Sequence, residues 1–174
     1  MTQKLYYFIY ETPFAPFYVF STESALIFAS FKNEVERDFF KGAVLNENLP
    51  VLQAAKAWLD KYFDGVDQEF TLPHVTNGTA FQATVWANLK TLRLGELVTY
   101  GNLSNIVAKE LGRSRMSAQA VGTAVGQNPL SIFIPCHRIV AAGNKLGGYG
   151  GGLSNKKALL IHEGYNISED KYYE

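Results

Sequence analysis

The residues of this chain best suited to chemistry lie in Pro135-Cys136-His137-Arg138-Ile139-Val140, which holds the only cysteine and one of the three histidines. A thiolate is a strong nucleophile, and a neighbouring histidine can lower the pKa of a thiol or carry its proton. Adjacent side chains of an extended segment point to opposite faces, so Cys136 and His137 would communicate through a bridging water molecule. The segment indicates a reactive thiol, although an unpaired cysteine is more often a small buried hydrophobic residue.

The residues before the cysteine are expected to hold it in place. Residues 130–134 form the apolar run Leu-Ser-Ile-Phe-Ile, which we interpret as a short buried strand. Pro135 has no backbone N–H and a fixed φ, so the strand would end there. Cys136 is therefore expected where a strand gives way to a turn, a position at which rigid scaffolds often present reactive groups.

Composition narrows the class of protein. The 174 residues are 47% hydrophobic and 14% aromatic, enough for one ordinary domain or two small ones with a real core. No apolar run approaches the length of a membrane span, and the first residues lack the pattern of a signal peptide. One cysteine allows neither an internal disulfide nor a cysteine-based zinc site, so we expect no metal. We therefore expect a cytoplasmic protein that does not bind membranes.

The net charge is zero, but the charges are unevenly distributed. Residues 1–79 hold six Lys or Arg against ten Asp or Glu, a net charge of −4, whereas residues 80–174 hold ten against six, a net charge of +4. Within residues 80–165 only Glu96, Glu110 and Glu163 oppose nine basic residues. This bias favours a nucleic-acid partner for the second half, while an ordinary mixed surface remains an alternative.

The first half has the pattern of a small α/β domain. Runs of aromatic and β-branched residues separated by turn residues predict an antiparallel sheet, with strands at Tyr6–Tyr10, Phe17–Ser21 and Ala25–Ala29. Two helices are expected next, one over Glu34–Lys41 capped by Asn33 and one from Pro50 to about Phe63. A short strand near Glu69–Leu72 and a polar linker at 73–78 follow, so we predict domains at 1–77 and 78–174.

The second half is predicted to be mainly helical. A capping box at Thr79 and Gln82 opens a helix whose Phe81, Val85, Trp86 and Leu89 share one face. A second helix carries Leu103 to Leu111, and a third, at 117–126, consists almost entirely of small residues. Small residues permit close packing inside the protein, which is the commoner cause, or close approach to a nucleic-acid backbone. Two compact helices beside a basic segment also fit a helix-turn-helix.

The ordered motifs of the second half resemble one protein family. The segment at Cys136 is preceded by Asn128-Pro129 and followed by Gly147-Gly148-Tyr149-Gly150-Gly151-Gly152 and His162-Glu163-Gly164. With Phe81-Gln82-Ala83-Thr84-Val85-Trp86 and Val98-Thr99-Tyr100, these segments resemble the methylated-DNA–protein-cysteine methyltransferases, or O6-alkylguanine-DNA alkyltransferases. The first half resembles this family only in length and pattern. The resemblance implies an α+β fold, with a ribonuclease-H-like sheet and a winged-helix-like domain that carries a helix-turn-helix.

The resemblance also implies a reaction. The protein would move an alkyl group from O6 of guanine in double-stranded DNA, less readily from O4 of thymine, onto its own cysteine, without turnover. Because the target atom is inaccessible in a stacked duplex, the nucleotide would be flipped out while the recognition helix lies in the minor groove. No cofactor would be needed, and the protein would act as a monomer.

The resemblance also implies roles for individual residues of this chain. Cys136 would be the alkyl acceptor, His137 its water-linked base, and Glu163 the carboxylate that orients the histidine; by its position alone Glu163 would pass as a solvated residue at a helix end. Tyr100 would donate to N3 of the extruded guanine, and Asn128 would couple the recognition helix to the cysteine turn. The implied base pocket comprises Ile139, whose carbonyl would accept from the guanine amine, with Tyr149, Gly150 and Trp86. The implied DNA contacts are Ala118, Gln119, Ala120, Gly122, Thr123, Arg115 and Arg138.

One position departs from the family pattern. Family members usually carry an arginine in the recognition helix that fills the space of the extruded base, but this sequence has Gln119. Glutamine can form hydrogen bonds there, yet it lacks the charge and the stacking plane of guanidinium. We expect weaker base extrusion, or help from Arg113 or Arg115 in the preceding turn.

Three classes of function therefore stand side by side. The stoichiometric alkyltransferase is favoured. An alkyltransferase-like lesion sensor would flag damage without repair, but that group replaces the acceptor cysteine, so Cys136 argues against it. An unrelated thiol enzyme is the third class. A redox protein would need a second cysteine to form a disulfide, which the chain lacks, and nothing beyond Cys136 and His137 suggests a hydrolase.

Overall fold

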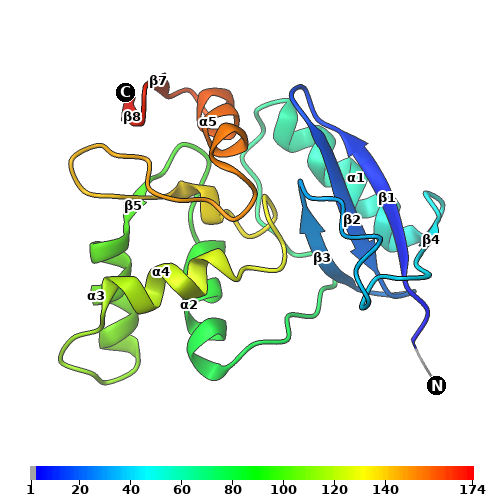
Figure 1. Cartoon of the computed structure of the whole chain (residues 1–174), viewed down its shortest axis with the longest axis horizontal. Helices are drawn as coiled ribbons and strands as arrows, with labels where there is room; N and C mark the ends of the chain where they lie inside the picture. Colours follow the sequence, from blue (N-terminus) through cyan, green and yellow to red (C-terminus); the bar gives the residue numbers. More distant parts are fainter. Residues whose placement is uncertain (1–2) are drawn as a thin grey trace.

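The computed structural model describes residues 3–174. The two halves of the chain lie side by side, with a β-sheet and one helix in the first half and a group of helices and short strands in the second (Figure 1). The fold is mixed α+β with a largely helical second half, as the sequence predicts.

The sheet of the first half has four strands in the order β3-β2-β1-β4. The predicted strands are confirmed as β1 (Tyr6–Glu11), β2 (Pro16–Ser21) and β3 (Leu26–Ser30), which pair antiparallel. Strand β4 (Val44–Leu45) adds a parallel edge beside β1. The sequence pattern did not indicate β4, because two residues are too short to show an alternation of apolar and polar side chains.

Helix α1 (Pro50–Phe63) packs against β1 and β2 and begins at Pro50, as predicted. Proline fits this first position because the N–H that it lacks would have no partner within the helix. The buried face of α1 carries Val51, Leu52, Ala55, Leu59 and Tyr62. Tyr62 lies in the last turn, at the side of the sheet that meets the second half.

Two predicted elements of the first half are wrong. Residues 34–41 form a series of turns rather than a helix, because Asn33 accepts from the Val35 amide, two residues ahead, instead of capping a helix. Residues 69–72 form no strand, since the Glu69 carbonyl accepts from the Trp58 indole of α1, 3.0 Å away.

The second half contains four longer helices and several short strands. The helices are α2 (Ala80–Lys90), α3 (Tyr100–Glu110), α4 (Ala118–Gly126) and α5 (Leu153–His162). The strands are β5 (Val98–Thr99), β6 (Ile139–Val140), β7 (Asn166–Ser168) and β8 (Lys171–Tyr173). The capping box of Thr79 and Gln82 is formed, and α3 and α4 pack together as the expected pair, with α2 against α4. None of the helices within residues 3–174 combines the length and the apolar character needed to cross a lipid bilayer.

The segment before the cysteine is a buried turn, not the expected strand. Ile132 has φ of +68°, and the Ile134 amide donates to the Leu130 carbonyl over 2.8 Å, so the chain folds back on itself. All five residues from 130 to 134 are nevertheless buried. A continuous apolar run fits a buried strand and a buried turn equally well, so periodicity alone could not distinguish them.

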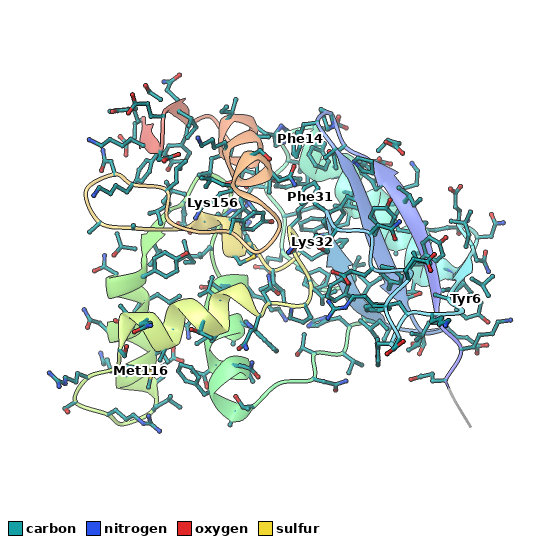
Figure 2. The ribbon with its side chains drawn as sticks, in the orientation of Figure 1. Tyr6, Phe14, Phe31, Lys32, Met116 and Lys156 are labelled. Carbon is teal, nitrogen blue, oxygen red and sulfur yellow. The ribbon has the colours of Figure 1, made fainter. Side chains whose placement is uncertain are left out.

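This turn joins the two halves. The Ala29 amide of β3 donates to the Pro129 carbonyl over 2.8 Å, and the Ser131 amide donates back to the Ala29 carbonyl over 3.0 Å. The Phe133 ring lies 5.0 Å from that of Trp58 on α1. Figure 2 shows Phe31 and Lys32 at the same boundary between the sheet and the second half. The first half is thus fixed directly to the residues that lead into Cys136.

A buried thiol beside a helix-turn-helix

Cys136 is the first residue of a short 3-10 helix, η1 (Cys136–Arg138), which directly precedes β6. Its side chain is largely buried and lines a cavity of about 420 Å³. The predicted residues Tyr100, Gly122, Asn128, Tyr149 and Gly150 line the same cavity. Residues far apart in the sequence therefore meet around the thiol.

Asn128 holds the turn that precedes the thiol. Its Nδ2 donates to the Ile134 carbonyl over 2.7 Å, and its Oδ1 accepts from the Leu130 amide over 3.0 Å. Asn128 lies two residues beyond the end of α4, so the same side chain connects that helix to the cysteine turn.

Burial raises the pKa of the Cys136 thiol, and the Asn128 amide and the charge of Lys156 offset only part of this effect. The thiol is therefore protonated at neutral pH. It needs a base before it can react as a thiolate.

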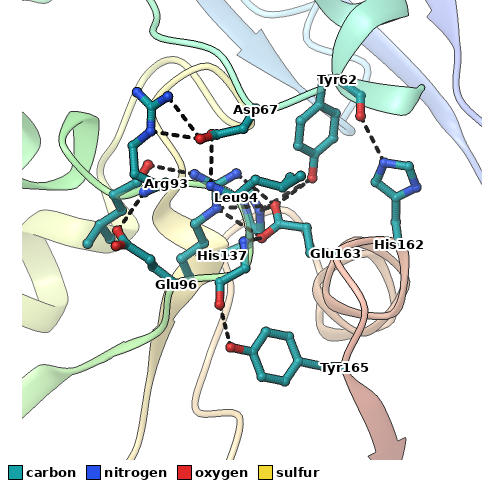
Figure 3. Close-up of polar contacts among 12 residues, drawn as sticks. Tyr62, Asp67, Arg93, Leu94, Glu96, His137, His162, Glu163 and Tyr165 are labelled. Carbon is teal, nitrogen blue, oxygen red and sulfur yellow. Dashed lines mark hydrogen bonds and ion pairs between the residues drawn. The ribbon is translucent and has the colours of Figure 1, made fainter. Parts of the chain in front are cut away.

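The neighbouring histidine belongs to a buried polar cluster (Figure 3). His137 Nε2 lies 2.7 Å from Glu163 Oε1, and both side chains are fully buried. The same carboxylate accepts from Arg138 Nε and Nη2, each at 3.0 Å, from the Tyr62 hydroxyl at 2.8 Å and from the Gly95 amide at 3.3 Å. Four donor atoms from three residues other than His137 thus fix this carboxylate.

The cluster determines which nitrogen of His137 carries the proton. Burial opposes the charge of Glu163, but His137 and Arg138 hold its pKa well below the ordinary value, so the carboxylate only accepts hydrogen bonds. Burial lowers the pKa of His137, although Glu163 acts against this, so the imidazole is neutral at pH 7 with its proton on Nε2. Nδ1 has no hydrogen-bond partner among residues 3–174 and is free to accept a proton.

Helix α5 supplies two buried charges to this site. Glu163 follows its last residue, and Lys156 lies seven residues earlier, on the same face. Lys156 is completely buried, and its Nζ donates to the carbonyls of Ile139 (2.6 Å), Gly148 (3.1 Å) and Leu146. Burial lowers the pKa of this lysine to about 8. Lys156 therefore holds both β6 and the loop that forms the cavity wall.

Tyr100 lies at the start of α3, directly after β5. Parallel pairing of β5 with β6 ties this residue to the segment that follows Cys136. The ring lies against glycines, since a Cβ on Gly147 would come within 2.9 Å of it and one on Gly122 within 3.5 Å. Burial raises the pKa of Tyr100, so its hydroxyl stays protonated and can donate.

The exposed face of α4 carries the residues expected to contact DNA. Ala118, Gln119, Ala120 and Thr123 are exposed, and Gly122 is half-buried against Tyr100. Gln119 and Gly122 line a shallow hollow together with Tyr100, Ala118 and Thr123. Arg115 is exposed in the preceding turn. The helix surface and the thiol cavity therefore share Tyr100 and Gly122.

Two sequence-based assignments need correction. Arg138 cannot serve as a DNA contact, because its side chain is 7% exposed and pairs with Glu163. Trp86 does not line the cavity; it is buried, and its indole donates to the Ala124 carbonyl over 2.9 Å, joining α2 to α4. Ile139 is fully buried and does not line the cavity either, and its carbonyl accepts from Lys156 over 2.6 Å.

The structure also brings in residues that the sequence did not single out. Tyr62 and Lys156 join the site, and the first half contributes Phe28, Ala29, Ser30, Lys32, Glu34 and Arg37 to the cavity lining. For Lys156 a signal existed, because it precedes Leu159 and Leu160 by three and four residues on the buried face of its helix. Among residues 3–174 no group of three or more His, Cys, Asp or Glu side chains is placed to hold a metal ion.

Comparison with known proteins gives a consistent result for both halves. A model described as 6-O-methylguanine DNA methyltransferase, ribonuclease-like domain, matches residues 5–74, and one for the DNA binding domain of the same protein matches residues 80–165. The methylated-DNA–protein-cysteine methyltransferase of Methanosarcina acetivorans is 37% identical over 161 residues, covering 92% of this chain and 99% of the relative. The protein of that name from Haemophilus influenzae is 37% identical over 157 residues, covering 90% and 84%.

Solved structures agree. The crystal structure of the Mycobacterium tuberculosis O6-methylguanine methyltransferase superimposes with a TM-score of 0.75 at 32% identity, covering 91% of this chain and 92% of that one. The complex of the M. tuberculosis protein with DNA gives a TM-score of 0.73 at the same coverage. Fold and site together define a DNA-binding protein with a single buried thiol in a cavity beside its helix-turn-helix. The chain belongs to the O6-methylguanine DNA methyltransferase family.

Proposed function

We propose that this protein repairs O6-alkylguanine in DNA by transferring the alkyl group irreversibly to Sγ of Cys136. The observation that carries the proposal is the position of Cys136 in a cavity that shares Tyr100 and Gly122 with the exposed face of the helix-turn-helix. A base extruded from DNA bound at α4 would enter this cavity and meet the thiol. O4-alkylthymine would be a poorer substrate of the same kind.

The chemistry is a displacement at the alkyl carbon. His137, acting through a water molecule, accepts the thiol proton on Nδ1, and Glu163 stabilises the resulting imidazolium through Nε2–H. The S–C bond forms while the C–O6 bond breaks, and the electron pair passes to guanine. The Tyr100 hydroxyl donates toward N3 and stabilises that developing charge. No cofactor is required, because DNA supplies the alkyl group and the protein accepts it.

The S-alkylated Cys136 product explains why each protein molecule would react only once. A thioether is a poor leaving group, and the chain has no second cysteine that could take over the alkyl group. We propose that the protein acts as a monomer on the minor groove of double-stranded DNA, in the cytoplasm. The net charge of +4 on residues 80–174 and the small side chains on the exposed face of α4 support this mode of binding.

An intact-mass measurement tests the function. After incubation with a duplex that contains one O6-methylguanine, we expect one added methyl group per chain, located on Cys136 by peptide mapping. The yield should stop at one equivalent of DNA even after long incubation. Protein that binds the modified duplex but stays unmodified would support the lesion sensor instead, and continued turnover would support a conventional thiol enzyme.

Gln119 provides a second test, of base extrusion. Gln119→Arg is expected to raise the rate of transfer from duplex DNA by about three- to tenfold, because guanidinium adds a charge and a stacking plane where the base leaves. Transfer from single-stranded DNA should change less, because no stacked pair has to be opened. Rates are measured in single-turnover assays on both substrates, and an equal change on both would contradict this role.

A further inference from the structure

Tyr62 connects the first half of the molecule to the reactive site in the second. It lies in the last turn of α1, is 2% exposed, and its hydroxyl donates to Glu163 Oε1 over 2.8 Å. The same hydroxyl lies 3.5 Å from His137 Nε2. The Tyr62 carbonyl accepts from His162 Nε2 over 3.0 Å, so backbone and side chain both bind the end of α5 (Figure 3).

The ring of Tyr62 by itself needs no hydroxyl. It stacks on Trp58 at 5.9 Å and packs against Phe63 at 4.9 Å, contacts that phenylalanine would also make. Nor does Glu163 need this hydroxyl to balance its charge, because Arg138 already binds both of its oxygens. The hydroxyl instead reaches Oε1, the one oxygen that also accepts from His137. The Tyr62 hydroxyl therefore acts on the hydrogen bond of His137, in addition to the contribution of the ring to the core.

We propose, on the basis of the proposed function, that Tyr62 is a positioning residue through which the first half of the chain takes part in alkyl transfer. Its hydroxyl holds the carboxylate that orients His137 and limits how strongly that carboxylate pulls on the imidazole. This gives the first half a role in the reaction beyond bracing the second half.

Tyr62 is expected to lower the pKa of His137, because both residues donate to the same atom, Oε1 of Glu163. A donor on Oε1 withdraws electron density, so the bond from His137 Nε2–H to Oε1 weakens and the imidazolium form is less stabilised. Burial raises the pKa of Tyr62 well above its ordinary value, so the hydroxyl remains a donor at all relevant pH values. Tyr62 thus helps to keep His137 neutral, which is the form that accepts the thiol proton.

Other groups around His137 act on it as well. Burial lowers its pKa most, the charge and hydrogen bond of Glu163 raise it, and the charges of Arg138 and Lys156 lower it further. His162 and Tyr149 face the cluster from α5 and from the cavity loop, His162 with its ring 5.2 Å from that of Tyr62. Replacing Tyr62 by phenylalanine leaves all of these groups in place, so the variant isolates the hydroxyl.

The test is the pH dependence of single-turnover methyl transfer by the full chain. In Tyr62→Phe the acid limb, which reports the pKa of His137, should move to higher pH by about half to one unit, while the plateau at higher pH stays close to wild type. Rates on the acid limb should then fall about three- to tenfold. Tyr10→Phe is the matched control, because it removes a tyrosine bond to Asp60 on the exposed side of α1 and should shift nothing.

Incorporation of 3-fluorotyrosine at position 62 gives the opposite prediction. The more acidic phenol donates more strongly, so the acid limb should move to lower pH, and the ring still fills its site. An unchanged acid limb in both variants would overturn the proposal. So would a uniform loss of rate at every pH together with a lower melting temperature in Tyr62→Phe, which indicates a purely structural role.

The proposed function can fail separately from this role. If the wild-type protein accepts no methyl group from DNA, the function is wrong, whereas the link between Tyr62 and His137 is still measurable by NMR titration of the His137 imidazole. A higher pKa of His137 in Tyr62→Phe supports the link, and an unchanged pKa refutes it.

Discussion

Replacing Cys136 by serine is expected to abolish alkyl transfer while leaving duplex DNA binding within about twofold of wild type. The serine hydroxyl is far less acidic than a thiol, and the neutral His137 is too weak a base to generate an alkoxide in a buried site. Removal of a nucleophile in comparable sites costs at least about 10⁴-fold in rate. The face of α4 proposed to contact DNA does not include position 136, so affinity should persist.

Two measurements decide this prediction. Intact mass after incubation with O6-methylguanine DNA should show no added methyl, and fluorescence anisotropy with the same duplex should give a Kd close to that of wild type. A thermal melt close to wild type is the control for folding. A methyl group found on another residue of the variant would contradict the assignment of Cys136 as acceptor.

The sequence alone predicts only part of the reactive centre. Adjacency predicts Cys136 and His137 as a pair, because the two residues share one turn whatever the fold. Glu163, 26 residues beyond His137, could be assigned only through the family motif, since helix periodicity places it at an exposed end. In the structure Gly164, with φ of +102°, ends α5 and the carboxylate turns inward onto Arg138.

Helix periodicity could not predict the hydrogen-bond partners of Tyr62 and Lys156. The sequence correctly predicts the helix from Pro50 to about Phe63, which in the structure buries the Tyr62 ring. The partner of the Tyr62 hydroxyl, however, depends on which element packs against this helix, and that contact spans 101 residues. The same reason explains why residues 130–134 form a turn and not the predicted strand. An apolar run records burial, whereas the backbone conformation within it is set by Asn128, whose side chain binds both the Leu130 amide and the Ile134 carbonyl.

The second large effect is expected for Glu163→Gln, which replaces the carboxylate of the buried cluster by an amide of nearly equal size. An amide carries no charge and has one acceptor oxygen, so it cannot satisfy Arg138, Tyr62 and His137 together. If its NH₂ group faces His137, Nε2 becomes the acceptor and the proton moves to Nδ1, the atom needed to take up the thiol proton. Transfer should slow by about 10²- to 10⁴-fold in single-turnover assays.

Stability should change in the same variant. Arg138 would remain buried without an anion, which typically costs about 3–5 kcal/mol, measurable by urea unfolding. The folded-state pKa of Glu163 is held below its unfolded value by His137 and Arg138, against the opposing effect of burial. Its contribution to stability is therefore fully present above the unfolded pKa of about 4.3 and is lost as the pH falls toward the folded pKa. The difference in stability between wild type and Glu163→Gln should narrow over that acidic range.

Asp67→Asn is the matched control for this change. Its carboxylate binds Arg93 Nε over 2.9 Å in a half-exposed pair, so the same carboxylate-to-amide change should cost at most about 1 kcal/mol and leave the rate of transfer unaltered. Assays are run well below the melting temperature of Glu163→Gln, so slow transfer by folded, DNA-binding protein reports the tautomer of His137 and not unfolding. A Glu163→Gln variant that transfers at the wild-type rate would show that the thiol loses its proton by another route.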